Sequence, residues 1–323
     1  MRCLVTGVAG FIGSHLAERL IELDHEVVGV DRFTDFYPRP RKEQNLARLR
    51  DERRFSLAEV DLAKGELDPL LDGAEIIFHL AAQAGVRASW GERFEIYLHD
   101  NVLATQRLLE AAKRRGTARK IIYSSSSSVY GQTHEMPMRE GSPTAPYSPY
   151  GVTKLSGEHL CDLYRDNHGL PTVALRYFTV YGPRQRPDMG FHRFIEAIRR
   201  GEAIPLYGDG EQTRDFTFVA DAVAANVQAM TADAVGVFNI GGGSRVTVNQ
   251  VLRTLGELAG EVRVERRPEQ AGDVRHTWAD TTRAREVLGY SPRVSLPEGL
   301  KAQVEWQLRA VNPGGEEASF VGA

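Results

Sequence analysis

The sequence lacks the residues and patterns that mark several classes of protein. Its 323 residues include only two cysteines, Cys3 and Cys161, too few for a disulfide framework or a cysteine metal site. The nine histidines show no metal-ligand spacing such as His-Glu-x-x-His, so we expect no metal. No apolar run approaches the roughly 18 residues of a membrane-spanning helix, and no secretion signal opens the chain. We expect a cytoplasmic protein with no membrane partner.

An excess of one charge is also lacking. Lysine and arginine number 40 against 43 aspartates and glutamates, so the net charge is -3. Such a balance gives no general reason to bind nucleic acid, and we expect no nucleic-acid partner. Hydrophobic residues make up 42% and charged residues 26%, which is typical of a globular protein with one large or two moderate domains.

Glycine, in contrast, is concentrated near the amino terminus. An apolar strand is expected over residues 2–6, and Gly7, Gly10 and Gly13 follow it before an amphipathic helix over residues 14–23. The first glycine permits a sharp turn, the second lets a pyrophosphate approach the backbone, and the third allows close packing of helix and strand. Free amides at the helix start then face the anion. This order predicts a dinucleotide-binding turn.

Asp31 ends a second apolar strand, 18 residues beyond Gly13. A carboxylate there can accept hydrogen bonds from both hydroxyls of the adenosine ribose and repels a 2'-phosphate, so the predicted cofactor is NAD rather than NADP. The adjoining Arg32 leaves NADP open, because an arginine at this point can hold that phosphate. A strand-end cap is the alternative role for Asp31. Asp61, at the end of the next strand, is expected near the adenine amine.

Strands and helices alternate through residue 178. This alternation predicts an α/β fold with a doubly wound parallel sheet of the Rossmann type, and a smaller α/β substrate-binding region towards the carboxyl terminus. The expected later elements are strands over residues 76–82, 120–124 and 172–177 and helices over residues 101–115 and 149–168. The expected domains are 1–178 for the cofactor, which also receives segments near 212–240, 179–312 mainly for the substrate, and a flexible tail at 313–323.

Tyr150 and Lys154 stand four residues apart in Tyr-Gly-Val-Thr-Lys. One helical turn places both side chains on the same face, where the ammonium favours the phenolate and lowers the tyrosine pKa. Such a pair can exchange a proton with a substrate hydroxyl near neutral pH. An ordinary helical i,i+4 contact is the alternative for a lone match.

Together these motifs resemble the extended short-chain dehydrogenase/reductases that modify nucleotide sugars. The resemblance covers nearly the whole chain. It implies that Tyr150 is the base, that Lys154 holds the nicotinamide ribose, and that Ser126, third in the serine run 124–128, contacts the reacting oxygen. The motifs that carry the resemblance are Gly7-x-x-Gly10-x-x-Gly13, Asp31, His79-Leu80-Ala81-Ala82, Asn101, Val129-Tyr130-Gly131, Tyr150-x-x-x-Lys154 and Arg214-Asp215-Phe216.

The resemblance also implies which residues bind the cofactor. The expected NAD-binding residues are Gly7, Gly10, Phe11, Ile12, Gly13, Asp31, Asp61, Leu62, Leu80, Ala81, Ala82, Asn101, Ser124, Tyr150, Lys154 and Tyr177.

Ser127 and Ser128 discriminate among the reactions of this superfamily. The sugar 4,6-dehydratases carry an acidic pair there and the UDP-glucuronate decarboxylases a glutamate, so two serines favour simple oxidation and re-reduction. The implied reaction is epimerisation at C4, in which the sugar gives hydride to NAD, turns its other face and takes the hydride back. A UDP-glucose/UDP-galactose 4-epimerase remains an alternative, and a decarboxylase or dehydratase is a weaker one.

The segment from Thr179 to Met189 resembles that of UDP-glucuronate 4-epimerases, which implies conversion of UDP-glucuronate to UDP-galacturonate. Arg186 is the expected partner of the substrate carboxylate, because an arginine fork matches a carboxylate, and Arg87 is the next candidate. Arg184 and Arg186 as solvated loop charges or diphosphate contacts are the alternative. The expected substrate-binding residues are Arg87, Ser126, Ser127, Thr179, Arg186, Met189, Arg214 for the diphosphate, and Asp273 near the uridine ribose.

Two further expectations concern the carboxyl-terminal half and assembly. Gln270 stands where many members of the family have arginine, which weakens transfer of that contact to this chain. A homodimer formed through the helices at 101–115 and 149–168 is implied by the resemblance and is the expected protein partner.

Overall fold

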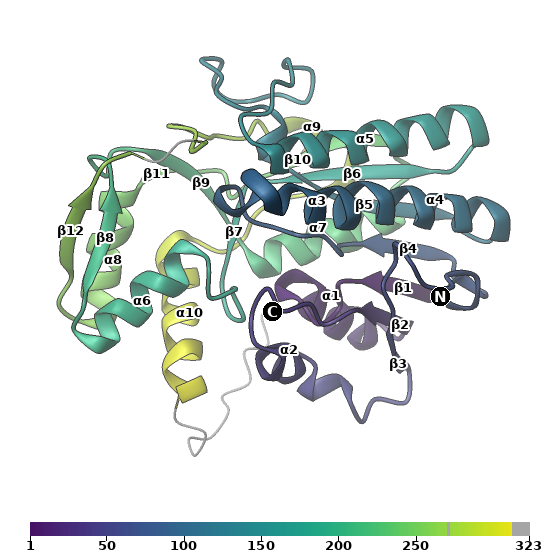
Figure 1. Cartoon of the computed structure of the whole chain (residues 1–323), viewed down its shortest axis with the longest axis horizontal. Coiled ribbons are helices and arrows are strands. Elements are labelled where there is room, and N and C mark those ends of the chain that lie inside the picture. Colours follow the sequence, from purple (N-terminus) through teal and green to yellow (C-terminus); the bar gives the residue numbers. More distant parts are fainter. Residues whose placement is uncertain (270–271, 312–323) are drawn as a thin grey trace.

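A seven-stranded parallel sheet forms the centre of the molecule (Figure 1). The computed structural model describes residues 1–269 and 272–311. Gln270 and the tail at 313–323 therefore lie outside the described residues. In spatial order the strands are β10 (Gly236–Ile240), β6 (Thr172–Tyr177), β5 (Lys120–Ser126), β4 (Ile76–His79), β1 (Arg2–Thr6), β2 (Glu26–Asp31) and β3 (Phe55–Glu59).

Helices cover both faces of this sheet. α1 (Phe11–Glu22) and α7 (Val219–Thr231) pack on one face, where their apolar side chains join those of alternate strand residues in one buried cluster. α4 (Ala104–Arg115) and α5 (Pro149–His168) pack on the other face in a second cluster. Burial on both faces explains why the strands read as continuous apolar runs. The predicted doubly wound α/β fold is confirmed.

The strand order reverses between β1 and β4. The chain builds β2 and β3 on one side of β1, and then β4, β5, β6 and β10 on the other side. A crevice opens at the carboxyl ends of the strands where such a reversal occurs, and ligands bind there. The glycine turn after β1 and the serine run that ends β5 both lie at this edge.

Two predicted elements have different boundaries in the structure. β4 ends at His79, and beyond it the Ala81 amide donates a hydrogen bond to the side-chain oxygen Thr6 Oγ1. The helix expected from Asn101 starts earlier, with α3 (Phe94–Tyr97) and a π-helical segment η5 (Leu98–Leu103) before α4. Wide turns of this kind often mark functional sites.

Two smaller sheets of the described chain lie to one side of the large sheet (Figure 1), and further helices connect the strands. The division into two domains stays a prediction, although β10 from the later part of the chain joins the large sheet. These elements are α2 (Arg39–Asn45), β7 (Thr179–Tyr181), α6 (Gly190–Arg200), β8 (Ala203–Tyr207), β9 (Thr213–Phe218), β11 (Arg245–Thr247), α8 (Val248–Ala259), β12 (Arg263–Arg267), α9 (Thr282–Leu288) and α10 (Leu296–Val311).

Residues 1–269 and 272–311 include no candidate membrane span and no candidate metal site. No helix in these ranges is both long and apolar enough to cross a bilayer. The same ranges hold no cluster of three or more His, Cys, Asp or Glu side chains placed to ligate a metal ion.

Candidate active site

The glycine turn between β1 and α1 is shaped for close backbone contact. Gly7 has a φ of +70°, a conformation that glycine adopts at no steric cost, and a Cβ there would lie 2.8 Å from the Ala81 nitrogen. A Cβ on Gly13 would lie 2.2 Å from the Gly7 carbonyl oxygen. The amides at the start of α1 therefore face a cradle that side chains would fill, as a pyrophosphate site requires.

Asp31 lies at the end of β2, inside the same crevice. Its carboxylate accepts hydrogen bonds from the Ala9 amide at 3.1 Å and the Phe33 amide at 2.8 Å. Burial raises the pKa of Asp31, and the Phe33 amide and the Lys42 ammonium oppose this shift. Asp31 thus caps the strand end and also lines the pocket in this crevice, so its position is compatible with the predicted contact to the ribose.

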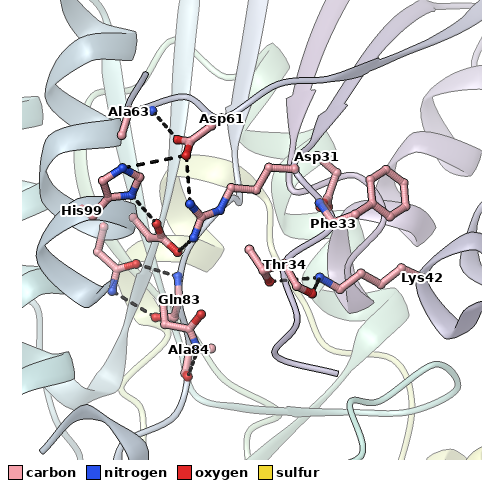
Figure 2. A network of polar contacts seen from close by, with 12 residues as sticks. Asp31, Phe33, Thr34, Lys42, Asp61, Ala63, Gln83, Ala84 and His99 are labelled. Atoms are coloured by element: carbon pink, nitrogen blue, oxygen red, sulfur yellow. Dashed lines mark hydrogen bonds and ion pairs between the residues drawn. The ribbon is translucent and has the colours of Figure 1, made fainter. Parts of the chain in front are cut away.

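Arg32 forms ion pairs with two carboxylates. Its guanidinium donates to Asp61 at 2.9 Å and to Asp100 at 2.7 Å. Figure 2 shows Asp61 beside His99 in this network, with Asp31 and Phe33 on its other side. Because both carboxylates neutralise Arg32, it is not free to receive a 2'-phosphate, and the residues present fit NAD better than NADP.

Tyr150 and Lys154 enter the crevice from the first turns of α5. The helix begins with Ser148, whose side chain accepts a hydrogen bond from the Gly151 amide, and Pro149 follows at the first helical position. The Lys154 ammonium donates to the Ser124 carbonyl at 2.7 Å. Burial lowers the pKa of Lys154 to about 8.

The direction of the Tyr150 pKa differs from the prediction. Burial raises it, while a hydrogen bond with Ser126 and the positive charge of Arg186 act to lower it. The expected net depression by Lys154 is therefore wrong for this structure, because desolvation of a phenolate outweighs the nearby charges. Ser126 lies at the tyrosine hydroxyl, and its expected contact with the reacting oxygen stays a prediction.

A pocket of about 230 Å³ runs along this crevice. It brings together nearly the whole set of residues expected to bind the cofactor. Those that line it are Gly7, Gly10, Phe11, Ile12, Gly13, Asp31, Asp61, Leu62, Leu80, Ala81, Ala82, Ser124, Tyr150, Lys154 and Tyr177.

Asn101 is the exception, because it does not line the pocket. Its side-chain oxygen accepts from the Gln83 amide at 2.7 Å, and its amide donates to the Gln83 carbonyl at 3.0 Å and to Thr153 Oγ1 at 2.9 Å. Asn101 thus braces Gln83, a pocket residue, against α5, and its expected contact with the cofactor stays a prediction.

Of the residues expected to bind substrate, Arg186 lines the same pocket as Tyr150. Its guanidinium makes two hydrogen bonds of 3.0 Å to the Asp188 carboxylate. Burial alone would lower the pKa of Arg186, but Asp188 raises it, so the guanidinium is charged. Ser126, Ser127, Thr179 and Met189 do not line this pocket.

A second group of expected substrate residues lies elsewhere. Arg87 pairs with Asp273 at 2.6 Å and stacks 4.4 Å above the ring of Tyr207. Arg214, on β9, donates to the Thr213 carbonyl at 2.8 Å, and burial lowers its pKa while Asp273 opposes this. Arg87, Arg214 and Asp273 thus form one polar cluster, separate from the walls of the cofactor pocket.

Several pocket residues were missed by the sequence reasoning. Lys42 is only 4% exposed and donates to the Thr34 carbonyl at 2.7 Å (Figure 2), although lysine side chains are rarely buried. No periodic pattern marks such a residue, because its burial comes from the loop that follows β2. The other missed pocket residues with polar or aromatic side chains are Arg32, Thr34, Phe36, Tyr37, Gln83, Asp100 and Ser125.

Known proteins resemble this chain along almost its full length. The family described as GDP-mannose 4,6 dehydratase matches residues 4–303. A Bacillus subtilis protein described as an uncharacterized UDP-glucose epimerase is 42% identical over 310 residues, which cover 95% of this chain and 98% of that protein. The UDP-glucuronate 4-epimerase of Thermodesulfobacterium geofontis is 36% identical over 308 residues, covering 94% and 95%.

A solved structure agrees with these relatives. The crystal structure of Bacillus cereus UDP-glucuronic acid 4-epimerase in complex with UDP-glucuronic acid and NAD superposes with a TM-score of 0.93 at 41% identity, covering 96% of this chain and all (100%) of that chain. The chain belongs to the NAD-dependent nucleotide-sugar epimerase/dehydratase family. Within this family it is one of the NAD-dependent UDP-sugar 4-epimerases.

Proposed function

We propose that the protein interconverts UDP-glucuronate and UDP-galacturonate by NAD-dependent epimerisation at C4. The observation that carries the substrate assignment is the position of Arg186, whose guanidinium lines the same pocket as Tyr150. A hexuronate carries a carboxylate at C6, close to the reacting carbon, and a charged guanidinium is its natural partner. The similarity to UDP-glucuronate 4-epimerases of two bacteria supports the same substrate.

Tyr150 is the proposed base. In its phenolate form, the side-chain oxygen next to Ser126 at the end of β5 accepts the proton of the sugar 4-hydroxyl and later returns it. Bound NAD supplies the hydride acceptor and donor for C4. Ser126 donates to the same sugar oxygen, and the charged Arg186 stabilises negative charge on Tyr150.

Gly7, Gly10 and Gly13 give the pyrophosphate close access to backbone amides in this proposal, and Asp31 faces the adenosine ribose. Lys154 binds the nicotinamide ribose while the Ser124 carbonyl holds its ammonium in place. The side chains at this end of β5 offer hydroxyls and no carboxylate, since Ser127 and Ser128 follow Ser126. That set suits oxidation and re-reduction, which favours an epimerase over a dehydratase or decarboxylase.

The UDP moiety is assigned to the polar cluster of Arg87, Arg214 and Asp273. Two guanidinium groups match the two negative phosphates, and the carboxylate of Asp273 can accept from a ribose hydroxyl. Arg87 lies within 2.6 Å of Asp273, so the cluster is already assembled. Thr179 and Met189 flank the loop that carries Arg186 and are assigned to the sugar side.

UDP-glucose is the alternative substrate, and one observation favours it. Asp188 already pairs with Arg186 through two hydrogen bonds of 3.0 Å, so the pair offers no net charge to a neutral hexose. The decisive experiment incubates the protein separately with UDP-glucuronate and UDP-glucose and resolves the C4 epimers by chromatography. A higher kcat/KM for UDP-glucuronate is expected. Turnover of UDP-glucose alone would reject the uronate assignment.

We also propose a homodimer through α4 and α5. Val152 and Leu163 are 47% and 57% exposed, and eleven residues of helix place them on one side of α5. Leu103, next to α4, is 44% exposed. Exposed apolar side chains on neighbouring helices favour burial against a second copy.

Sedimentation equilibrium should give twice the chain mass, and Leu163→Glu should give a monomer. A monomeric parent protein would contradict the proposal.

A further inference from the structure

Glu158 is a buried carboxylate that the reaction described above does not use. It lies on α5 four residues after Lys154 and eight after Tyr150, so the three side chains occupy one face of the helix. The residue is only 3% exposed. A buried charge is costly unless it is paired, which raises the question of why this helix keeps one beside the active site.

The end of β5 contacts all three residues of this helix face. The Ser124 carbonyl accepts from the Lys154 ammonium at 2.7 Å, and the Ser125 hydroxyl donates to the Glu158 carboxylate. Ser126 bonds the Tyr150 hydroxyl. Three consecutive residues of the strand therefore fix three successive turns of the helix.

Arg176, on β6, holds the other side of Glu158. Its guanidinium makes two hydrogen bonds to the carboxylate, at 2.9 and 2.7 Å, and lies 4.7 Å above the ring of Tyr130. A third donor reaches the Glu140 carbonyl at 3.3 Å. The two hydrogen bonds from Arg176 thus fix the carboxylate in place one helical turn from Lys154.

Among the groups around Lys154, Glu158 is the one that most favours the charged form of the lysine. Burial lowers the pKa of Lys154, and Glu158 is the largest influence that opposes this. Burial keeps neighbouring groups uncharged near neutral pH, because it raises the pKa of the Cys161 thiol and of Tyr123 and lowers that of His79 to about 3.

We infer that Glu158, held by Arg176, is a positioning residue that keeps Lys154 protonated and aligned with Tyr150 during turnover. The inference rests on the proposed function only through the roles given to Lys154 and Tyr150. Because a neutral lysine could neither stabilise the phenolate nor donate all its hydrogen bonds, the pair sets the upper pH at which the site works.

The direct test is the titration of Lys154 in the NAD-bound protein. The chain has only six lysines, so protein labelled with 15N at the lysine side chains gives few NMR signals, and Lys154→Met identifies the one of interest. Glu158→Gln should lower the Lys154 pKa by about one pH unit, which is a tenfold change in its proton affinity. Asp162→Asn, on the same helix and paired with Arg165, is the matched control and should leave it unchanged.

A second variant keeps the test possible if Glu158→Gln destabilises the folded protein. Glu158→Gln leaves Arg176 buried without its partner, whereas Glu158→Gln/Arg176→Gln removes both charges. The double variant should recover thermal stability but keep the lowered Lys154 pKa, and the alkaline limb of kcat should move to lower pH with whichever UDP-hexose is turned over. An unchanged Lys154 titration in both variants would overturn the inference. Failure with UDP-glucuronate alone would reject the substrate and leave this test intact.

Discussion

At the scale of single residues, burial and charge compete at Tyr150. Burial disfavours the phenolate, and the hydrogen bond from Ser126 and the charge of Arg186 favour it. The same guanidinium is the proposed partner of the substrate carboxylate. Because Arg186 lies near both the base and the expected C6 carboxylate, binding and proton transfer are linked at one side chain.

Removing the Tyr150 hydroxyl should abolish most of the activity. Tyr150→Phe keeps the ring but cannot exchange a proton, so kcat should fall by about 100-fold or more while the purified protein still contains NAD. Steady-state kinetics and the absorbance of extracted cofactor measure the two quantities. Tyr147→Phe, at an exposed tyrosine just before α5, is the control and should behave as the parent. Parent-like turnover of Tyr150→Phe would exclude it as the base.

Arg186→Ala should weaken binding of the uronate selectively. Loss of a charge-assisted contact worth roughly 1.5–3 kcal/mol should raise the KM for UDP-glucuronate by about 10- to 100-fold. The same variant should also release some UDP-pentose. A 4-ketouronate loses carbon dioxide readily when its carboxylate is free to rotate, and Arg186 restrains that rotation. Chromatography of the product mixture detects the pentose.

The control for this change is Arg193→Ala, at an exposed arginine of α6 outside the pocket. It removes the same charge from the neighbouring helix and should leave both the KM and the products unchanged. If Arg186→Ala kept the parent KM for UDP-glucuronate, the guanidinium would not bind the carboxylate.

At the scale of elements, the turn between β1 and α1 allows a strict test. Gly13→Ala places a methyl group 2.2 Å from the Gly7 carbonyl oxygen, so the helix must move away from the strand. Overpacking of this kind costs about 1–3 kcal/mol and displaces the amides that face the pyrophosphate. NAD content after purification should fall at least about tenfold.

Gly141→Ala is the matched change, because a Cβ there meets no atom within 4 Å. It should leave NAD content and thermal stability as in the parent. Full NAD content in Gly13→Ala would show that close packing at this turn is not needed for the cofactor.

Local sequence signals predicted some elements well and others badly. The helix at 149–168 is confirmed to the residue, because Ser148 caps it, Pro149 starts it and Gly169 ends it with a φ of +68°. The predicted start of a second helix at Asn101 is wrong, because the helical segment begins earlier in the chain. Its π-helical segment accompanies the contacts of Asn101 with Gln83 and Thr153, which lie elsewhere in the sequence.

At the scale of the whole molecule, strand and helix alternation was enough to predict the fold and the edge of the sheet where ligands bind. The contacts that complete the site could not be predicted from this alternation, because they join residues that are far apart in the sequence. Arg32 and Asp100 are 68 residues apart, and Arg87 and Asp273 are 186 apart. The raised pKa of Tyr150 also required the three-dimensional burial of the ring, which no spacing reveals.

The buried ionisable groups predict lower stability in mild acid. Burial lowers the pKa of His15 and His79 to about 3, so below about pH 6.5 the unfolded chain binds protons that the folded protein does not, and stability falls as pH falls. Burial raises the pKa of Asp215 to about 6, which acts in the opposite direction between about pH 6 and pH 4.

The net effect should be a loss of about 3 kcal/mol between about pH 7.5 and pH 5.5, since these two histidines and His192, whose pKa burial lowers to about 4, outweigh one aspartate. Urea unfolding at both pH values, with saturating NAD, measures it through the transition midpoint. A midpoint that stayed constant or rose on acidification would show that these histidines titrate in the folded protein.

The return of hydride to C4 is tested most directly with UDP-glucuronate that carries deuterium at C4. This substrate is incubated with the purified protein in ordinary water. We expect UDP-galacturonate that retains the deuterium, because the same atom leaves C4 and returns to it within the site. Mass spectrometry of the separated product reads the label. Product that has lost the deuterium to solvent, or no UDP-galacturonate at all, would contradict the central claim.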